Sequence, residues 1–353
     1  MIPVPANVSP WWRPHRHQDR RPFLLARSRM AAAARAFFSA QDFVEFEPAI
    51  LQISPGNEVH IKAFKTEILD GNGAKFPLYL HSSPEFAAKK LLSAGERRLF
   101  AFTHVFRNQE RGPLHHPEFT LLEWYRAAEP YQKLIEDCME LLESTVTAAG
   151  SRSLAFAGHV SDPFRPPEIL SVAEAFERHC GLDLVATLSD PERGRRLLAD
   201  GAQSHGLRVS PDDSWRDIFS KILSAKIEPQ LGHGRPTILM DYPAAEAALS
   251  QLKADPRFAE RFELYACGVE LANGFGELRD ADIQRARFET AEALRQELYG
   301  ETYPIDEDFL AALSIMPPAS GIALGFDRLA MLATGAAHIE QVVWTPLPGS
   351  PGV

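Results

Sequence analysis

The chain has 353 residues, of which 45% are hydrophobic, so it can build one large domain or two modest ones and is not an intrinsically disordered protein. Its 37 Lys and Arg residues against 47 Asp and Glu residues give a net charge of -10, which excludes general attraction to nucleic acid or anionic lipid. The 3 widely separated cysteines, with no long apolar run and no leader-like segment, predict a soluble cytoplasmic protein without membrane contact.

The N-terminal third combines an irregular start with helices and paired strands. Residues 1–23 are rich in Pro, Trp, Arg and His without periodicity, and we expect an N-terminal arm. A long helix is predicted for residues 24–40, followed by a strand in "FVEFEPAIL". The segment "HIKAFKTEILDGNGAKFPLYLHSS" predicts a hairpin whose "DGNG" glycines serve the turn and not a phosphate. A helix in "PEFAAKKLLSAG" and a strand in "RLFAFTHVFRN" come next.

The rest of the chain predicts a helical segment between strand-rich parts. Residues 130–149 form an amphipathic helix, and residues from about 150 to 235 are interpreted as a helical insertion without a chemical motif. Strands return in "PTILMDYP", "RFELYACGVELANGFGEL" and "SGIALGFDRLAMLATG", with a charged helix among them. The pattern predicts an α+β fold in which helices flank an antiparallel sheet.

The stretch "FRNQERGPLHHPEFTLLEWYRA" predicts a hairpin with a polar tip. The charged tip residues are Arg107, Glu110, Arg111, His115 and His116. Guanidinium groups match phosphate oxygens, so the tip could bind an anion, although solvated hairpin charges are the alternative. On the returning strand, Glu123 and Tyr125 share one face, where they could bind an ammonium group or simply face solvent.

Two later stretches also contain residue types that bind ligands. Glu263, Glu270 and Glu277 recur at intervals of seven residues around a strand pair, and such carboxylates either hold Mg²⁺ with phosphate oxygens or form an acidic surface hairpin. In "GFDR", Gly325 would allow a flat ligand to approach the backbone and Arg328 would stack on it, although a glycine turn before a helix is usually structural.

Taken together and in this order, the three stretches resemble the class II aminoacyl-tRNA synthetase catalytic core. "HHPEFTLLEWY", "ELANGFGEL" and "GFDRLAML" resemble its lysine branch, and "ARAFFSAQDFVEFEP" is similar to the first motif at the family's dimer interface. The core begins almost at once, so we expect a catalytic domain over residues 24–353, no anticodon-binding domain and no stable binding of a tRNA anticodon. This layout resembles the truncated lysyl-tRNA synthetase paralogues that ligate lysine to elongation factor P.

The resemblance implies an ATP- and Mg²⁺-dependent ligase that acts as a homodimer. Such an enzyme would adenylate lysine or (R)-β-lysine and transfer it to a lysine side chain of elongation factor P. Two alternatives stay open: a lysyl-adenylate-forming enzyme with another acceptor, such as tRNA or a small amine, and a non-catalytic nucleotide-binding paralogue that regulates translation.

The resemblance also implies roles for individual residues. Arg107 would be catalytic, Phe119 and Arg328 would sandwich adenine, and Glu263 and Glu270 would hold Mg²⁺. The implied nucleotide-binding residues are Arg107, Asn108, Gln109, His115, His116, Phe119, Glu270, Leu271, Gly325 and Arg328. The implied amino-acid-binding residues are Ser83, Pro84, Glu85, Glu123, Tyr125, Asn273, Phe275 and Glu277.

The sequence departs from the family pattern at four positions, one of them in the first motif, which keeps Pro48 but lacks the threonine usual before it. Family members usually have Glu at the position of Gln109 and Asn at that of His116, so we expect ATP binding to lose one charge and to become dependent on pH. Ala323 occupies the place of a glycine of lysyl-tRNA synthetases, and its methyl group is expected to suit a β-amino acid better than α-lysine.

Overall fold

The computed structural model describes residues 10–347, and its first helix corrects the expected N-terminal arm. Helix α1 (Pro14–Ser39) includes residues up to 23 that were expected to be irregular. Proline suits the first turn of a helix because its missing N–H would have had no partner there. Arg20 of α1 is buried and donates hydrogen bonds to the backbone oxygens of Glu340 and Val343. The start of α1 is thus held by contacts with the distant C-terminal part of the chain. Residues 1–9 of the expected arm lie outside the described residues.

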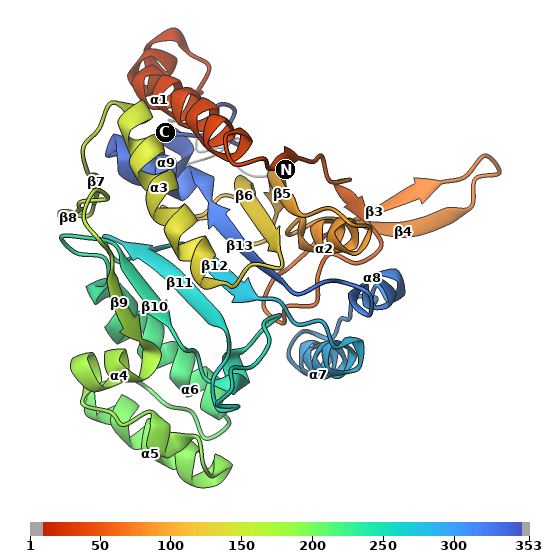
Figure 1. Ribbon diagram of the computed structural model, residues 1–353, viewed down its shortest axis with the longest axis vertical. Helices are drawn as coiled ribbons and strands as arrows, with labels where there is room; N and C mark the ends of the chain where they lie inside the picture. Colours follow the sequence, from red (N-terminus) through yellow and green to blue (C-terminus); the bar gives the residue numbers. More distant parts are fainter. Residues whose placement is uncertain (1–9, 348–353) are drawn as a thin grey trace.

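A central sheet of eight strands in the order β1-β5-β6-β13-β12-β11-β10-β9 organises the described residues (Figure 1). Neighbouring strands from β5 to β10 pair antiparallel, whereas β1 and β9 at the two edges pair parallel. The α+β class is confirmed, with a sheet that is antiparallel in its middle. The strands are β1 (Val44–Glu45), β5 (Arg98–Phe106), β6 (Glu118–Ala127), β9 (Glu168–Ser171), β10 (Thr237–Met240), β11 (Arg261–Ala266), β12 (Val269–Gly276) and β13 (Ala319–Gly325).

Helices α1, α3 (Gln132–Ala149) and α9 (Phe326–Thr334) pack together over one face of this sheet (Figure 1). Leu122 and Trp124 of β6 point into this apolar layer, where they join Phe38 of α1. Since successive side chains of a strand point to opposite faces, Glu123 and Tyr125 are directed to the other face. The apolar layer therefore fixes which residues of β6 are available to a ligand.

The other face of the sheet is bordered by α2 (Glu85–Ser93), α7 (Ala281–Tyr299) and α8 (Glu307–Leu313). Phe86 of α2 stacks on Phe309 of α8 with ring centroids 4.0 Å apart, and Tyr125 of β6 belongs to the same buried cluster. These helices close one end of the space above the sheet and hold α2 in place.

A second sheet contains the predicted hairpin, which is confirmed. Strands β3 (Phe64–Leu69) and β4 (Lys75–Leu80) pair antiparallel, and β2 (Leu51–Gln52) adds to β4. In the turn, the Asp70 carboxylate accepts hydrogen bonds from the backbone N–H groups of Asn72 and Ala74 at 2.8 Å. The glycines of "DGNG" thus serve a turn, as predicted.

The expected helical insertion contains helices but also strands that the sequence analysis missed. Helices α4 (Val172–Cys180), α5 (Pro191–Ser204) and α6 (Trp215–Ile222) form a separate apolar cluster with β9 and β10. A small hairpin of β7 (Leu154–Phe156) and β8 (His159–Ser161) precedes them, and β9 extends the central sheet. Short helical turns complete the described chain: η1 (Val185–Thr187), η2 (Leu223–Ile227), η3 (Glu228–Gln230), η4 (Ala244–Glu246) and η5 (Ile339–Gln341).

Between residues 10 and 347, no helix has both the length and the apolar character that crossing a membrane would require.

Candidate active site

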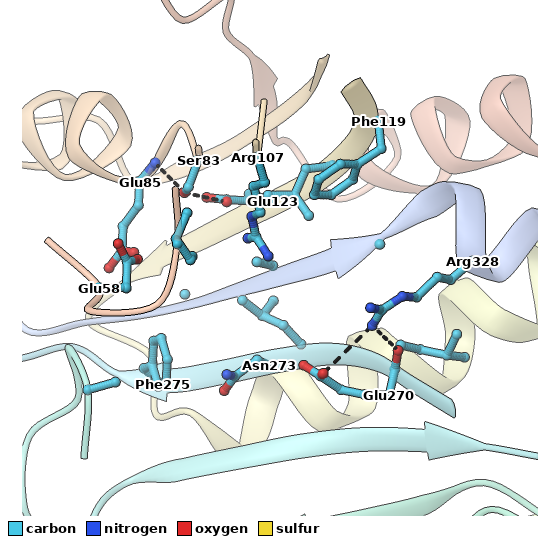
Figure 2. A pocket seen from close by; sticks show the side chains of 18 of the residues that line it. Glu58, Ser83, Glu85, Arg107, Phe119, Glu123, Glu270, Asn273, Phe275 and Arg328 are labelled. Carbon is cyan, nitrogen blue, oxygen red and sulfur yellow. Dashed lines mark hydrogen bonds and ion pairs between the residues drawn. The ribbon is translucent and has the colours of Figure 1, made fainter. Parts of the chain in front are cut away.

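A cavity of about 430 Å³ lies over the free face of the central sheet, between β6, β13 and β12 (Figure 2). The register of these strands determines its floor, because Glu123 pairs with Ala323 and Ala323 pairs with Asn273. One step further along, Tyr125 and Phe275 flank Gly321. The strand residues that line the cavity are Phe119, Leu121, Glu123, Tyr125, Arg261, Glu270, Leu271, Asn273, Phe275, Gly321, Ile322, Ala323 and Gly325.

A β-bulge in β12 turns Glu270 toward the cavity. Leu264 pairs with Ala272, but the next residue, Tyr265, pairs with Glu270, so Leu271 has no opposite partner. An extra residue in one strand reverses the side-chain alternation beyond it, which places Glu270 on the same face as Asn273. The spacing of the glutamates in the sequence could not show this.

Glu123 lies at the end of the cavity that is nearest α2. Its Oε1 accepts a hydrogen bond from Ser83 Oγ and its Oε2 accepts one from the Tyr125 hydroxyl, both at 2.6 Å. Burial, together with the nearby Glu85 carboxylate, raises the pKa of Glu123 to about 8. Because a bound cation would favour the ionised form, this carboxyl group is suited to bind an ammonium ion.

Lys89 of α2 is a buried cation between two other carboxylates of this end. Its Nζ forms ion pairs at 2.6 Å with Glu85 Oε1 and with Glu277 Oε2. Burial disfavours the charge on Lys89, but the two carboxylates outweigh burial and raise its pKa. Burial also raises the pKa of Glu277 to about 7, with Lys89 acting against the shift and Glu85 adding to it. Lys89 thus holds both carboxylates in fixed positions.

Glu58, which the sequence analysis missed, also lines the acidic end. It comes from the loop between β2 and β3, and Figure 2 shows its carboxylate beside that of Glu85. Its Oε2 is buried and has no hydrogen-bond partner among the described residues. "PGNEVH" carries no motif that would have identified Glu58, whereas Lys89 could have been noticed because it lies four residues after Glu85 on a helix.

Basic and aromatic side chains line the opposite end of the cavity. Arg107 follows β5, its guanidinium carbon lies 5.2 Å from the centre of the Phe119 ring, and its Nε is buried without a hydrogen-bond partner. In Figure 2, Arg107 projects into the cavity between Glu123 and Phe119. No carboxylate of the described chain lies within ion-pair distance of Arg107, so this guanidinium remains available to an anionic ligand.

Arg328 is held at the same end by α9 and β12. Its Nη1 donates a hydrogen bond of 2.9 Å to the backbone oxygen of Glu270 and lies 3.7 Å from Glu270 Oε2 (Figure 2). Its Nη2 lies 2.7 Å from His115 Nε2, and burial followed by the charge of Arg328 lowers the pKa of His115. The neutral imidazole can accept this hydrogen bond, so the guanidinium plane is fixed over the cavity.

Comparison with known proteins shows to which family this chain belongs. Residues 11–348 match the family model described as tRNA synthetases class II (D, K and N). The chain belongs to this class II synthetase family. The predicted class II catalytic core is thereby confirmed.

Several curated relatives within the class II synthetase family are similar over nearly all of their length. A protein of Haemophilus ducreyi is 38% identical over 324 residues, which cover 91% of this chain and 92% of that protein. A protein of Haemophilus influenzae is 38% identical over 323 residues, with 91% and 93% covered. A protein of Histophilus somni is 37% identical over 326 residues, with 91% and 93% covered. Each is named "Elongation factor P–(R)-beta-lysine ligase".

Most of the residues that the class II resemblance implied line the one cavity. On the acidic side these are Ser83, Glu85, Glu123, Tyr125, Asn273, Phe275 and Glu277, and on the basic side they are Arg107, His115, His116, Phe119, Glu270, Leu271, Gly325 and Arg328. Pro84 lies just outside, as the residue before α2, and lines a small neighbouring cavity instead. Asn108 and Gln109 are exposed on the hairpin loop and do not line the cavity.

Glu263, the other predicted metal ligand, does not line the cavity, although it pairs with Asn273 on the same face of the sheet. Its Oε1 accepts a hydrogen bond of 2.7 Å from Arg261, and its Oε2 accepts bonds of 2.5 and 2.6 Å from the hydroxyls of Tyr242 and Tyr265. Among residues 10–347, no group of three or more His, Cys, Asp or Glu residues could hold a metal ion. Of the two predicted metal ligands, Glu270 lines the cavity, and the carboxylate of Glu263 is held by Arg261 and two tyrosine hydroxyls.

Proposed function

We propose that this chain is an ATP-dependent ligase that activates lysine or (R)-β-lysine as an acyl-adenylate and transfers it to a lysine side chain of elongation factor P. The observation that carries the proposal is the division of one cavity into an end of buried carboxylates and an end with Arg107, Phe119 and Arg328. The names of the curated relatives support the same substrates.

The acidic end fits a diamino acid. Lysine carries two ammonium groups, and each needs a carboxylate or hydroxyl partner when it leaves water. Glu123 and Tyr125 provide one such partner set on β6, and Glu85 with Glu277 adds two carboxylates fixed by Lys89. Ala323 pairs with both Glu123 and Asn273, so its methyl group lies in the floor under the substrate. This methyl group supports the β-isomer as the preferred substrate.

The basic end fits ATP. Adenine can stack between the Phe119 ring and the Arg328 guanidinium, and Arg107 lies where the two ends of the cavity meet. In the first step, a carboxylate oxygen of the amino acid forms a bond to the α-phosphorus of ATP, and the bond to pyrophosphate breaks. Arg107 would hold both reacting groups and stabilise the charge that develops on the phosphate.

Mg²⁺ is part of the proposal because its expected ligands are carboxylate and phosphate oxygens. Mg²⁺ is usually bound by one or two carboxylates together with substrate phosphates, and Glu270 is positioned to supply one of these carboxylates. When bound, the ion would neutralise the charge of the departing pyrophosphate. In its present hydrogen bonds, Glu263 would hold Arg261 and Tyr265 in place. To bind the ion as a second carboxylate, it would have to give up one of these hydrogen bonds.

The second step needs no nucleophilic side chain of the enzyme. The uncharged amine of the acceptor lysine would attack the acyl carbon, an amide bond would form, and AMP would leave as its bond to the acyl group breaks. The enzyme would contribute by holding the adenylate in one orientation, while the proton of the amine passes to solvent or to the leaving phosphate.

We also propose that the enzyme acts as a homodimer in the cytoplasm. Val44, Leu51 and Ile53 expose apolar side chains around the segment that is similar to the family's first motif, and an exposed apolar patch of this kind favours contact with a second copy. Cys138, Cys180 and Cys267 are free and buried, which is compatible with a reducing compartment.

The test is a two-step assay with purified protein. ATP–pyrophosphate exchange is expected with lysine or (R)-β-lysine and not with other amino acids, and the product should then transfer to elongation factor P as a mass increase of one residue. Replacing the acceptor lysine of elongation factor P by arginine should abolish the transfer but not the exchange. Exchange without transfer would favour a different acceptor, and no exchange with either isomer would refute the proposal.

A further inference from the structure

The loop that carries Glu58 is fixed in place by α7. Arg295 of α7 is fully buried and donates hydrogen bonds to the backbone oxygens of Glu58 and Ile61. On the same helix, Glu292 accepts a hydrogen bond of 2.8 Å from Asn57 Nδ2. The backbone on both sides of Glu58 is therefore anchored, and its side chain has little freedom to leave the cavity.

The side chain of Glu58 folds back over Gly56 and into the cavity. Gly56 has φ +105°, and a Cβ at this position would lie 2.6 Å from Glu58 Oε2 and 3.2 Å from Ser82 Oγ. Only glycine both accepts this backbone conformation and leaves room for the carboxylate. In Figure 2 the carboxylates of Glu58 and Glu85 lie together at one side of the cavity.

Glu58 differs from the other cavity carboxylates in its partners. Glu123 accepts hydrogen bonds from two hydroxyl groups, and Glu85 and Glu277 share the ammonium of Lys89. Oε2 of Glu58 is buried without a donor, which is costly for an ionised carboxylate. A cationic group of the substrate would supply the missing partner.

The contacts of this loop indicate which ammonium group this is, because the backbone N–H of Asn108, the residue after Arg107, donates a hydrogen bond of 2.7 Å to the Lys62 oxygen, four residues after Glu58. Burial and then Glu85 raise the pKa of Glu58, against the opposing effects of its own backbone amide and of Arg107. The loop of Glu58 is thus joined to the chain beside Arg107, whereas Glu277 and Tyr125 meet at Gly321, where a Cβ would lie 2.3 Å from Glu277 Oε1 and 2.4 Å from the Tyr125 ring. Since Arg107 would bind the reacting carboxylate, Glu58 lies toward that carboxylate and Glu277 lies farther from it.

We propose that Glu58 is a specificity-determining residue, whose carboxylate joins that of Glu85 to bind the amino group nearer to the reacting carboxylate of the diamino acid. The distal ammonium is then left to Glu123, Tyr125 and Glu277. This inference rests on the proposed function and extends it. It predicts that the cavity selects against 6-aminohexanoate, which has the same length as lysine and β-lysine but lacks the proximal amino group.

The test compares Glu58→Gln with the wild-type enzyme in ATP–pyrophosphate exchange. KM for whichever lysine isomer supports exchange should rise by roughly 10- to 100-fold, because a charged hydrogen bond is lost. The inhibition constant of 6-aminohexanoate against the same reaction should change by less than about 3-fold, because that ligand never used the carboxylate. The KM for ATP and the kcat at saturating substrate should stay near their wild-type values.

Two further variants separate binding from structure. Glu58→Asp keeps the charge on a shorter side chain and should give a KM between those of the wild type and Glu58→Gln. Glu67→Gln removes an exposed carboxylate that pairs with Lys75 on the hairpin outside the cavity, and it should leave all constants unchanged.

The outcomes are distinguishable. Equal weakening of the lysine isomer and of 6-aminohexanoate would mean that Glu58 has a structural role, and no change for either would mean that it does not contact the substrate; each overturns the inference while leaving the proposed function intact. A wild-type enzyme that exchanges with neither isomer would overturn the proposed function, and this inference with it, before any variant is needed.

Discussion

The two ends of the cavity are built in different ways. The acidic end uses side chains of β6, of α2 and of the residues next to α2 and β12 that bind one another, as in the contacts of Glu123 with Ser83 and of Lys89 with Glu277. At the basic end, Arg328 is held mainly by backbone oxygens and by His115 of a loop, and Arg107 has no acidic partner in the described chain. Apart from that of Glu58, the carboxylates of the acidic end are thus held by other side chains of the protein, whereas Arg107 at the basic end has its charge available to a ligand.

The largest effect is expected at the junction of the two ends. Arg107→Ala should lower the rate of ATP–pyrophosphate exchange by about 10³-fold, because this guanidinium would touch both the carboxylate and the phosphate in the transition state. Its Nε has no partner in the free protein, so the melting temperature should stay close to that of the wild type. An exchange rate within about 10-fold of the wild type would place the reacting groups elsewhere.

A pair of glycines on β13 can separate the two ends. A Cβ at Gly321 would lie 2.3 Å from Glu277 Oε1 and 2.4 Å from the Tyr125 ring, so Gly321→Ala should raise KM for the amino acid by roughly 100-fold with little effect on KM for ATP. At Gly325 the nearest atom would be Arg328 Cδ at 3.6 Å, an ordinary contact. Gly325→Ala should therefore leave the amino-acid KM unchanged and act only on ATP binding.

The reverse pattern, in which Gly321→Ala weakens ATP binding and Gly325→Ala weakens amino-acid binding, would contradict the assignment of the two ends. Both constants can be measured in the same exchange assay by varying one substrate at a time, and circular dichroism would establish that each variant is folded.

From the carboxylates of the acidic end we expect amino-acid binding and the stability of the fold to change in opposite directions with pH. The folded protein raises the carboxyl pKa from 4.5 to about 8 for Glu123 and to about 7 for Glu277, mainly by burial. These groups keep their protons longer in the folded than in the unfolded chain, so the free energy of unfolding without ligand should fall as the pH rises from about 4.5 to 8.

Amino-acid binding should follow the opposite direction, because an ammonium ion needs the ionised carboxylates. KM for the amino acid should fall by up to about 10-fold per unit as the pH rises toward 8, while KM for ATP serves as the control from the other end. An amino-acid KM that stays flat across this range would show that the carboxylates are already ionised without ligand.

Sequence reasoning succeeded where local pattern and strand alternation determine the structure. The hairpin of β5 and β6 and the shared face of Glu123 and Tyr125 follow from period-two alternation, and the cavity confirms that these two side chains lie together. The implied roles of the site residues came from the family resemblance and remain predictions. What the sequence could not show depends on tertiary contacts: the bulge that turns Glu270 and the anchoring of Glu58 by Arg295.

Glu263 gives the clearest example of this limit. Its spacing from Glu270 suggested a pair of metal ligands, but the hydroxyls of Tyr242 and Tyr265 and the guanidinium of Arg261 occupy its carboxylate. Tyr242 lies before β11, in a segment where no sequence pattern marked it as a neighbour of Glu263. Arg261 and Tyr265 lie two residues from Glu263 on the same strand face, so only the contact with Tyr242 depends on the folded sheet.

The smallest effect is expected at Gln109, on the hairpin tip beyond the basic end. The resemblance implied that ATP binding loses one charge at this position, but Gln109 is exposed, has φ 68° and does not line the cavity. A charge placed in water at this distance is largely screened. Gln109→Glu should therefore change KM for ATP by less than about 3-fold, as measured by exchange at saturating amino acid. A decrease of 10-fold or more would mean that the loop closes over the nucleotide and that position 109 then contacts adenine, so that the basic end is completed only by its ligand.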